Sequence, residues 1–310
     1  MAIIDILGVP HTYDLTPSSS TASQPTLVFV HGWLLSRHYW RPLIDRLVAD
    51  YQCLAYDLRG FGHSQADEIE SQGCWSENSN KTNPLDIEFT EICASRYTPS
   101  AYARDVGILL KELKIERAWL VGHSLGGTIA LWAAHQLPEQ VEGVICLNAG
   151  GGIYLKEAFE KFRAAGQQIL RYRPRWLCYL PAIDVLLSIT NVARPVPRVW
   201  GRQRVIDFVM AQGEAAVRTL LDSTTEAEVN RLPQLVSSLE QPVYFIAGAQ
   251  DKMMEPQYVH HLASFHALFE TSGQNVIEIS DCGHLSMVEQ PEAVATQIRQ
   301  IIRLHQVLET

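Results

Sequence analysis

Short apolar runs alternate with segments of helical periodicity along most of this 310-residue chain. Thr26–Val30 is a continuous β-branched and aromatic run, which is typical of a strand buried on both faces. Later runs of the same kind are Cys53–Tyr56, Ala118–Val121, Val141–Leu147, Val243–Gly248 and Asn275–Ile279. Helical spacing of apolar residues marks Arg37–Ala49, Pro99–Leu113, Leu125–His135 and Pro291–Leu308. This alternation predicts an α/β fold with a mostly parallel central sheet and helices on both faces.

Two segments interrupt the alternation. Residues 67–97 contain a polar, irregular stretch that is rich in acids, with Lys81 as its one lysine, and we interpret them as an acidic loop insertion. Residues 150–236 are rich in helical pattern and are punctuated by prolines, so we interpret them as an inserted helical cap. The predicted core is then formed by residues 1–149 and 237–310.

The strongest chemical signal is a G-x-S-x-G pattern centred on Ser124. It follows a predicted strand and precedes a predicted helix, which is the context of a nucleophile elbow. Gly122 and Gly126 suit such a turn, because a Cβ atom at either position would collide with neighbouring chain. The N–H groups at the start of the helix would face an oxyanion formed at Ser124. Since the pattern also occurs by chance, the interpretation depends on partners for the serine.

A base and an orienting acid are available at the ends of two later strands. Asp251 follows the run that ends at Gly248, and His284 follows the run that ends at Ile279. An aspartate after a strand is often only a turn residue, and a single histidine is often structural. In a parallel sheet, however, all these strand ends lie at one edge. The order Ser124, Asp251, His284 therefore predicts a catalytic triad at that edge.

On these residues the chain resembles the α/β-hydrolase-fold superfamily, whose order is nucleophile, acid, histidine. His31-Gly32-Trp33 is similar to the family's oxyanion loop, and Asp57–Ser64 resembles its D-x-R-G-x-G-x-S segment. Gly283-His284 followed by Glu289-Gln290-Pro291-Glu292 is similar to its histidine loop. The resemblance covers about 1–150 and 236–310 and implies the inserted cap. Residues 67–97 are longer than the corresponding family segment.

The resemblance also implies roles for individual residues. The oxyanion hole would be formed by the backbone N–H groups of Trp33 and Leu125, with Leu34 replacing Trp33 if the loop register differs. His31 would fix the oxyanion loop. The remaining polar residues of these motifs would be structural, namely Asp57, Arg59, His63 and His123. No metal or organic cofactor is implied.

The predicted activity is hydrolysis of a carboxylic ester through an acyl-enzyme, in which Ser124 attacks, His284 transfers the proton and Asp251 orients the imidazole. Haloalkane dehalogenases and epoxide hydrolases are excluded, because they need an aspartate at the nucleophile position. One alternative is a lyase, since the segment HGWLLS resembles the 2-succinyl-6-hydroxy-2,4-cyclohexadiene-1-carboxylate synthase branch. A second alternative is a receptor that keeps the triad and turns over slowly.

The predicted cap has an unusual composition between Lys161 and Arg204, where basic residues are interleaved with aromatic and aliphatic ones and Asp184 is the one acid. Snorkelling arginines on amphipathic helices would explain this pattern, and so would pairing with the acidic insertion. A lid over an apolar pocket with a basic rim would explain it as well. We expect a lipophilic acyl or prenyl ester as substrate, with possible peripheral membrane contact through the basic cap.

The net charge and the cysteine content exclude further classes of protein. The formal net charge of −9 argues against nucleic acid as a partner. The six cysteines form no C-x-x-C pair, so a zinc ribbon is not expected. We expect the cysteines to be free thiols in a cytoplasmic protein. A link between Cys74 and Cys93 and the oligomeric state stay open. The N-terminus lacks the features of a signal peptide, which also favours the cytoplasm, at or away from a membrane face.

Overall fold

The computed structural model describes residues 1–17, 24–65, 95–150, 156–171, 173–272 and 275–306. Most of the predicted acidic insertion and the first residues of the predicted cap lie outside these ranges, as do Cys74, Cys93 and Leu308. Within them, the chain forms a sheet with the strand order β1-β2-β4-β3-β5-β6-β7-β8. Its strands are β1 (Ala2–Ile6), β2 (Val9–Leu15), β3 (Thr26–Val30), β4 (Cys53–Tyr56), β5 (Ala118–His123), β6 (Val141–Leu147), β7 (Val243–Gly248) and β8 (Val276–Ile279).

The sheet is parallel from β4 to β8, and only the pairs β1–β2 and β2–β4 are antiparallel. Strands β3, β4, β5 and β7 are buried at every residue and are apolar apart from Thr26 and His123, as their sequences predict. The predicted mostly parallel α/β fold is therefore confirmed. Since the strands run in one direction, their carboxyl ends define a single edge, and Gly122 on β5 lies beside Val30 on β3 and Cys146 on β6.

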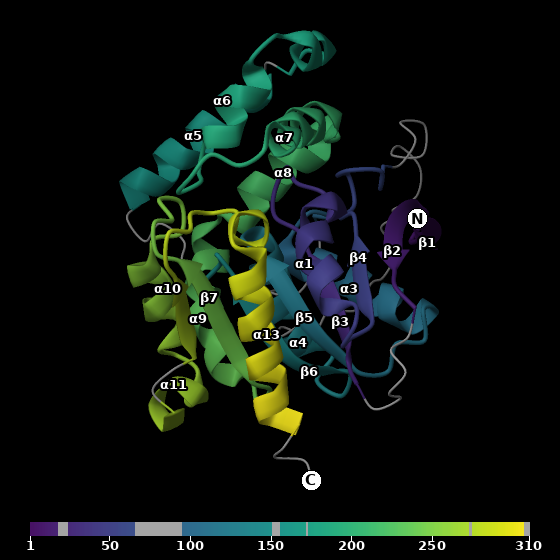
Figure 1. The fold of residues 1–310 in the computed structure, drawn as a ribbon, viewed down its shortest axis with the longest axis vertical. Coiled ribbons are helices and arrows are strands. Elements are labelled where there is room, and N and C mark those ends of the chain that lie inside the picture. Colours follow the sequence, from purple (N-terminus) through teal and green to yellow (C-terminus); the bar gives the residue numbers. More distant parts are fainter. Residues whose placement is uncertain (18–23, 66–94, 151–155, 172, 273–274, 307–310) are drawn as a thin grey trace, which may run out of the picture.

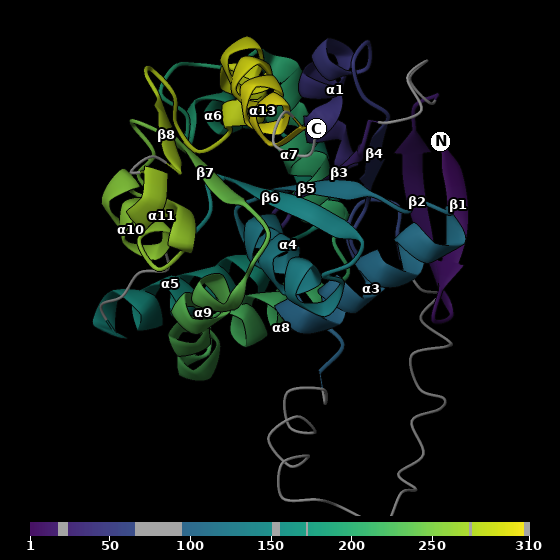
Figure 2. The ribbon, with the colours of Figure 1, turned by 90° about the horizontal axis from the view of Figure 1, so that it is seen from below.

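Helices cover both faces of the sheet (Figure 2). One face carries α1 (Arg41–Leu47), α12 (Ser286–Glu289) and α13 (Pro291–Gln306) over the apolar cluster that includes Phe29 and Ile298. The other face carries α3 (Pro99–Glu112), α4 (Leu125–Gln136), α10 (Pro256–Ala263) and α11 (Ala267–Ser272). Here Tyr102, Ile129 and Phe245 belong to the second cluster. The sheet is thus the middle of three layers.

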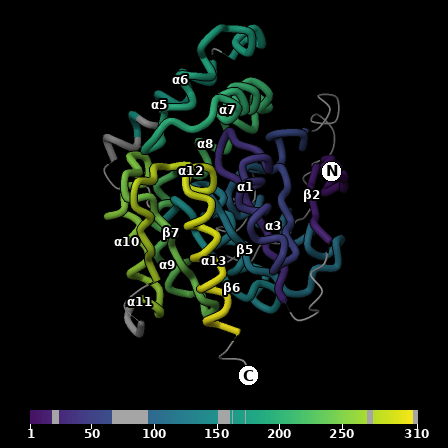
Figure 3. The backbone as a smooth tube through the Cα atoms, viewed as in Figure 1, coloured from purple at the N-terminus to yellow at the C-terminus, as the bar shows by residue number. Residues whose placement is uncertain are grey.

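The segment between β6 and β7 forms further helices, the last of which packs on α4 and α10 at one face of the sheet. They are α5 (Lys156–Arg171), the 3₁₀ helix η3 (Arg175–Tyr179), α6 (Ile183–Ile189), α7 (Arg198–Met210), α8 (Gly213–Ser223) and α9 (Glu226–Ser238). Helices α5, α6 and α7 lie at one end of the longest axis and the C-terminus lies at the other (Figures 1 and 3). Helix α8 lies against the core, where the Gln212 N–H donates to the Gly60 carbonyl at 2.8 Å.

Three local expectations differ from the structure. The helix expected over Arg37–Ala49 is divided into a 3₁₀ helix, η1 (Arg37–Trp40), and α1, because Pro42 provides no N–H for a continuous helix. Strand β8 begins at Val276, one residue later than expected, although the Asn275 carbonyl still accepts from the Phe245 N–H at 2.7 Å. The antiparallel hairpin β1–β2 has no counterpart among the predicted strands.

Candidate active site

Ser124 occupies a strained turn between β5 and α4. Its φ of 52° and ψ of −121° place a non-glycine residue in a region that L-amino acids rarely adopt. The Ser124 N–H donates to the Leu147 carbonyl at 3.0 Å, and the Ser124 carbonyl accepts from Gly127 N–H at 2.9 Å. These bonds hold the serine at the start of α4 with its side chain half-buried.

The glycines around Ser124 are required by close backbone approach. A Cβ atom on Gly122 would overlap the Gly126 carbonyl, and one on Gly126 would overlap the Val30 carbonyl. Gly32 on the adjacent loop is similarly confined, because its Cβ atom would lie 3.2 Å from the Ser124 Cβ atom. The strand, the loop and the helix therefore meet at Ser124 at backbone distance, as a nucleophile elbow requires.

The structure brings His284 and Asp251 into direct contact. His284 Nδ1 lies 2.8 Å from Asp251 Oδ2, and both residues are buried. Asp251 Oδ1 also accepts from the backbone N–H groups of Met253 and Met254, at 2.8 and 3.0 Å. Burial raises the pKa of Asp251, but the hydrogen bonds from His284 and its other donors outweigh this effect, so the pKa is lowered. The ionised carboxylate fixes the proton on His284 Nδ1 and leaves Nε2 as the basic nitrogen.

Asn148 joins the loop that carries Asp251 to the loop that carries His284, and the sequence analysis missed it. Its Nδ2 donates to Asp251 Oδ2 and to the Gly283 carbonyl, both at 2.9 Å. Its Oδ1 accepts from the Ser286 hydroxyl. Asn148 is fully buried and follows β6 directly, with φ at 48°. A signal was present, because a polar residue at the carboxyl end of a strand is the same criterion that identified Asp251.

The loop after β3 lies beside the serine, as the close approach of Gly32 to Ser124 shows. Among the residues that the structure describes, neither the Trp33 nor the Leu125 backbone N–H has a hydrogen-bond partner. His31 Nε2 accepts from Leu58 N–H at 2.9 Å, which leaves Nδ1 to donate to the Gly32 carbonyl at 2.8 Å. Burial lowers the pKa of His31, so the ring is neutral and braces the loop.

The side chain of Trp33 connects this loop to the helices beyond the sheet edge. Its indole Nε1 donates to the Ala216 carbonyl on α8 at 2.8 Å. Leu34, the alternative donor considered from the sequence, has φ at 57°, so the loop turns sharply immediately after Trp33. The position of the loop therefore depends on both β3 and α8.

Glu289 fixes the histidine loop from the other side. Its carboxylate accepts from the backbone N–H groups of Gly283 and Leu285, each at 2.9 Å, and from Ala193 N–H at 2.7 Å. The His284 N–H donates to the Asn191 carbonyl at 3.0 Å. Because Asn191 and Ala193 lie between α6 and α7, this segment is bound directly to the loop that carries the imidazole.

His123 packs beside the imidazole. Their ring centroids are 4.8 Å apart, and His123 Nε2 lies 2.7 Å from the His284 carbonyl oxygen. Burial, with a further contribution from His284, lowers the pKa of His123 to about 3. The ring is thus neutral and donates through Nε2. His123 therefore makes a packing and hydrogen-bonding contact, and it lies closer to the candidate base than the sequence suggested.

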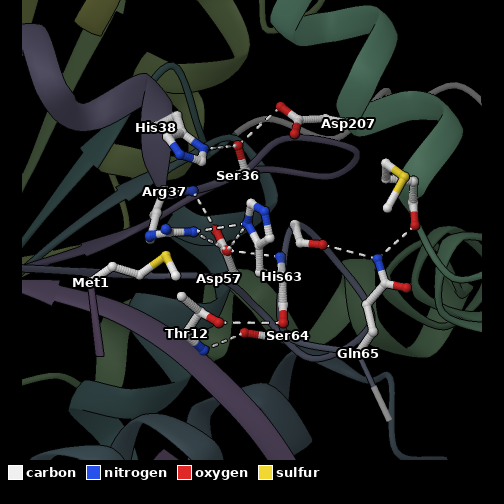
Figure 4. A network of polar contacts seen from close by, with 12 residues as sticks. Met1, Thr12, Ser36, Arg37, His38, Asp57, His63, Ser64, Gln65 and Asp207 are labelled. Atoms are coloured by element: carbon white, nitrogen blue, oxygen red, sulfur yellow. Dashed lines mark hydrogen bonds and ion pairs between the residues drawn. The ribbon is translucent and has the colours of Figure 1, made fainter. Parts of the chain in front are cut away.

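A polar network holds the loop after β3 through Ser36 and Arg37 (Figure 4). Asp57 accepts from the Arg37 N–H at 2.7 Å, from the Arg37 guanidinium at 2.5 Å and from the His63 N–H at 2.9 Å. Beside this network, the Ser36 hydroxyl donates to Asp207 on α7 at 3.0 Å. Arg59 pairs separately with the buried Asp105. These residues connect loops to one another and do not reach Ser124.

Ser124, Asp251 and His284 all follow strands at the carboxyl edge, but only the second and third are hydrogen-bonded to each other. The described contacts include none between Ser124 Oγ and His284, a bond that is often long before a ligand is bound. In the described part of the chain, no group of three or more His, Cys, Asp or Glu side chains is arranged to hold a metal ion. No helix there is long and apolar enough to cross a membrane.

Comparisons with known proteins agree with this architecture. The family model for the alpha/beta hydrolase fold matches residues 25–291. The chain is 26% identical over 291 residues to the pimeloyl-[acyl-carrier protein] methyl ester esterase of Stenotrophomonas maltophilia, covering 91% of this chain and 94% of that enzyme. It is also 26% identical over 287 residues to the uncharacterized hydrolase YugF of Bacillus subtilis, covering 90% of each.

Solved structures share the fold. A thermophilic esterase from Thermogutta terrifontis superposes with a TM-score of 0.69 at 23% identity, over 95% of this chain and 93% of that one. A putative lipase from Acinetobacter baumannii superposes with a TM-score of 0.74 at 18% identity, over 99% and 91%. Fold and sequence together define an α/β enzyme scaffold with its polar groups at one sheet edge. The chain belongs to the α/β hydrolase family, and the family and hydrolase class predicted from the sequence are confirmed.

Proposed function

We propose that this chain is a serine esterase in which Ser124, His284 and Asp251 act as a catalytic triad. The observation that carries the proposal is the His284–Asp251 hydrogen bond of 2.8 Å, which leaves the basic Nε2 atom available at the sheet edge that bears Ser124. The esterase names among the relatives support ester bonds as the target. A triad of this kind cleaves esters without a metal or an organic cofactor.

In this mechanism His284 Nε2 accepts the Ser124 proton as the hydroxyl attacks the ester carbonyl carbon. Asp251 keeps the proton on Nδ1 and stabilises the imidazolium that forms. The backbone N–H groups of Trp33 and Leu125 stabilise the oxyanion, since neither is used by another described group. The imidazolium then protonates the leaving alkoxide, and water repeats the sequence to release the acid from the acyl-enzyme.

We further propose that residues 150–236 form a cap on a core of residues 1–149 and 237–310, and that the substrate is a lipophilic acyl or prenyl ester. Half-buried apolar side chains suit such a group, and they are those of Trp33 and Leu34, on the loop that approaches Ser124, and of Leu125, the next residue in the chain. The Trp33 indole bond to Ala216 links this apolar wall to α8. The role of residues 67–97 is not part of the proposal.

The test is hydrolysis of p-nitrophenyl esters from acetate to palmitate, with Ser124→Ala beside the wild-type chain. We expect turnover that falls at least about 10⁴-fold in the variant, with a preference for longer acyl chains. Ser237→Ala, which changes an exposed serine on α9, is the matched control and should retain full turnover. If folded wild-type protein shows no turnover above Ser124→Ala on any ester, the esterase proposal is wrong and the lyase and receptor alternatives gain support.

A further inference from the structure

Large apolar side chains are exposed on η3, α6 and the start of α7. Helices α6 and α7 lie at one end of the molecule (Figure 1). We call this group of side chains the outer cap face. Its members share an exposed fraction of at least 39%, and they are Trp176, Tyr179, Leu180, Val185, Leu186, Ile189 and Val199. Because α6 and η3 both pack on α7, these residues are concentrated on neighbouring elements. Exposed hydrophobic residues that occur singly need no explanation, but such a concentration indicates a surface that contacts another molecule.

The orientation of α6 shows that this exposure is built into the fold. Ser188 is the one buried residue of this helix, whereas Leu186 is 59% exposed and Ile189 is 51% exposed. In an ordinary surface helix the apolar residues would face inward. Helix α6 instead presents Val185, Leu186 and Ile189 to the exterior, while its other apolar residues, Ile183 and Leu187, are half-buried.

Specific contacts hold α6 in this orientation. Gly201 on α7 lies so close to α6 that a Cβ atom there would overlap the Asp184 carbonyl. The Arg204 guanidinium donates to the Leu187 and Thr190 carbonyls at 2.7 and 2.6 Å. A rotation of α6 that buried Leu186 and Ile189 would break these contacts. The outer cap face is therefore a fixed surface.

The charge beside this face is positive, although the whole chain carries −9. Arg171 and Arg175 are exposed and have no acidic partner among the described residues. Asp184, the one acid between Lys161 and Arg204, is paired with Arg198 at 2.9 Å. The face thus combines apolar residues, unneutralised arginines, a tryptophan and a tyrosine.

We propose that the outer cap face docks on the surface of an anionic lipid bilayer. Tryptophan and tyrosine suit the boundary between acyl chains and headgroups, aliphatic side chains enter the acyl region, and arginines pair with anionic headgroups. A second copy of this chain fits less well, because a two-fold contact would bring the same arginines together. This inference goes beyond ester hydrolysis and does not depend on it.

The test is co-sedimentation of the full chain with sucrose-loaded vesicles. We expect binding to vesicles of phosphatidylcholine with phosphatidylglycerol, and weak binding to phosphatidylcholine alone. Leu186→Ser/Ile189→Ser should weaken the binding at least about tenfold through lost apolar insertion. Arg171→Ser/Arg175→Ser should weaken it about 25-fold, at roughly fivefold for each charge, and this effect should shrink in high salt.

Two control variants remove similar groups elsewhere. Ile3→Ser/Leu304→Ser removes exposed apolar residues of β1 and α13, and Arg41→Ser/Arg104→Ser removes exposed arginines of α1 and α3. Both should bind like the wild-type chain, and thermal unfolding establishes that every variant is folded.

The proposal is overturned if anionic vesicles do not bind the chain at low salt, or if the cap variants bind as well as the controls. It is also overturned if the outer cap face mediates a dimer that Leu186→Ser/Ile189→Ser dissociates. Because vesicle binding needs no turnover, these outcomes are separate from failure of the esterase proposal.

Discussion

The carboxyl edge of the sheet and the outer cap face are built in opposite ways. At the sheet edge, Asp251 and Asn148 are buried and the nearby Glu289 is half-buried, and each of these side chains is held by several hydrogen bonds. At the outer cap face, apolar side chains are exposed while Ser188 is buried. Buried, multiply bonded polar groups give a fixed geometry, which chemistry needs. Exposed apolar groups on a fixed helix give a contact surface, which recognition needs.

The largest expected effect tests the chemical half of this comparison. His284→Ala should lower kcat for a p-nitrophenyl ester by about 10⁴-fold or more, because it removes the proposed base. The control is His260→Ala, which changes an exposed histidine paired with Glu278 on the core. Near-wild-type kcat in His284→Ala would contradict the proposed role of the imidazole.

The next effect concerns how tightly the sheet edge is packed. Gly126→Ala should lower the free energy of unfolding by about 3 kcal/mol or more, since the new Cβ atom overlaps the Val30 carbonyl. Gly213→Ala on α8 is the matched control, because its Cβ atom would meet only the end of Arg173 at 3.5 Å. Chemical denaturation measures both. Equal stability of the two variants would show that the elbow tolerates more volume than the structure allows.

A smaller effect is expected from Asn148, which is hydrogen-bonded to Asp251 of the proposed triad and to the Gly283 carbonyl. Asn148→Ala should lower kcat by about 10- to 100-fold with little change in KM, because the acid and histidine loops lose their shared donor. Asn275→Ala is the control, since this buried asparagine bonds to the Val243 carbonyl away from the site. If both variants lose stability and activity to the same extent, the role of Asn148 is only structural.

The smallest effect lies where the two regions meet, at Asp207 on α7. Burial raises the pKa of this carboxyl to about 7. Between about pH 4 and that value the folded chain therefore holds a proton that the unfolded chain has lost, and the free energy of unfolding falls as the pH rises. Asp207→Asn removes this titration and should be more stable than the wild-type chain at pH 8, by roughly 1–2 kcal/mol.

Thermal unfolding of Asp207→Asn from pH 5 to pH 9 measures this difference. The Ser36 hydroxyl can accept from the new amide, so the link between the oxyanion loop and α7 is kept. Asp45→Asn changes an exposed carboxyl on α1 and is the control. A wild-type chain that gains stability relative to Asp207→Asn above pH 7 would reverse the predicted sign.

The inner sheet could be predicted because its strands are continuous apolar runs with sharp ends, and Val141–Leu147 and Val243–Gly248 match in both bounds. Polar residues after β5, β7 and β8 predicted the candidate triad positions, since the carboxyl ends of parallel strands share an edge. The hairpin of β1 and β2 escaped prediction because an edge strand with exposed residues such as Ile3 lacks a buried apolar run.

The contacts between the core and the helices beyond it could not be predicted. The bond of Trp33 to Ala216 spans 183 residues, and that of Ser36 to Asp207 spans 171. Such pairs depend on how two segments pack in space, and no local pattern encodes them. The exposure of Leu186 and Ile189 on α6 is of the same kind, because an apolar helical run does not show which of its residues will lack a covering element.

The most direct test of the proposed triad is labelling of the folded chain with a fluorophosphonate, followed by intact mass measurement and peptide mapping. The account predicts one adduct per chain, located on Ser124, with a rate that falls by orders of magnitude in His284→Ala and is unchanged in His260→Ala. An adduct on any other residue, or an unlabelled Ser124 in protein that still hydrolyses esters, would contradict it.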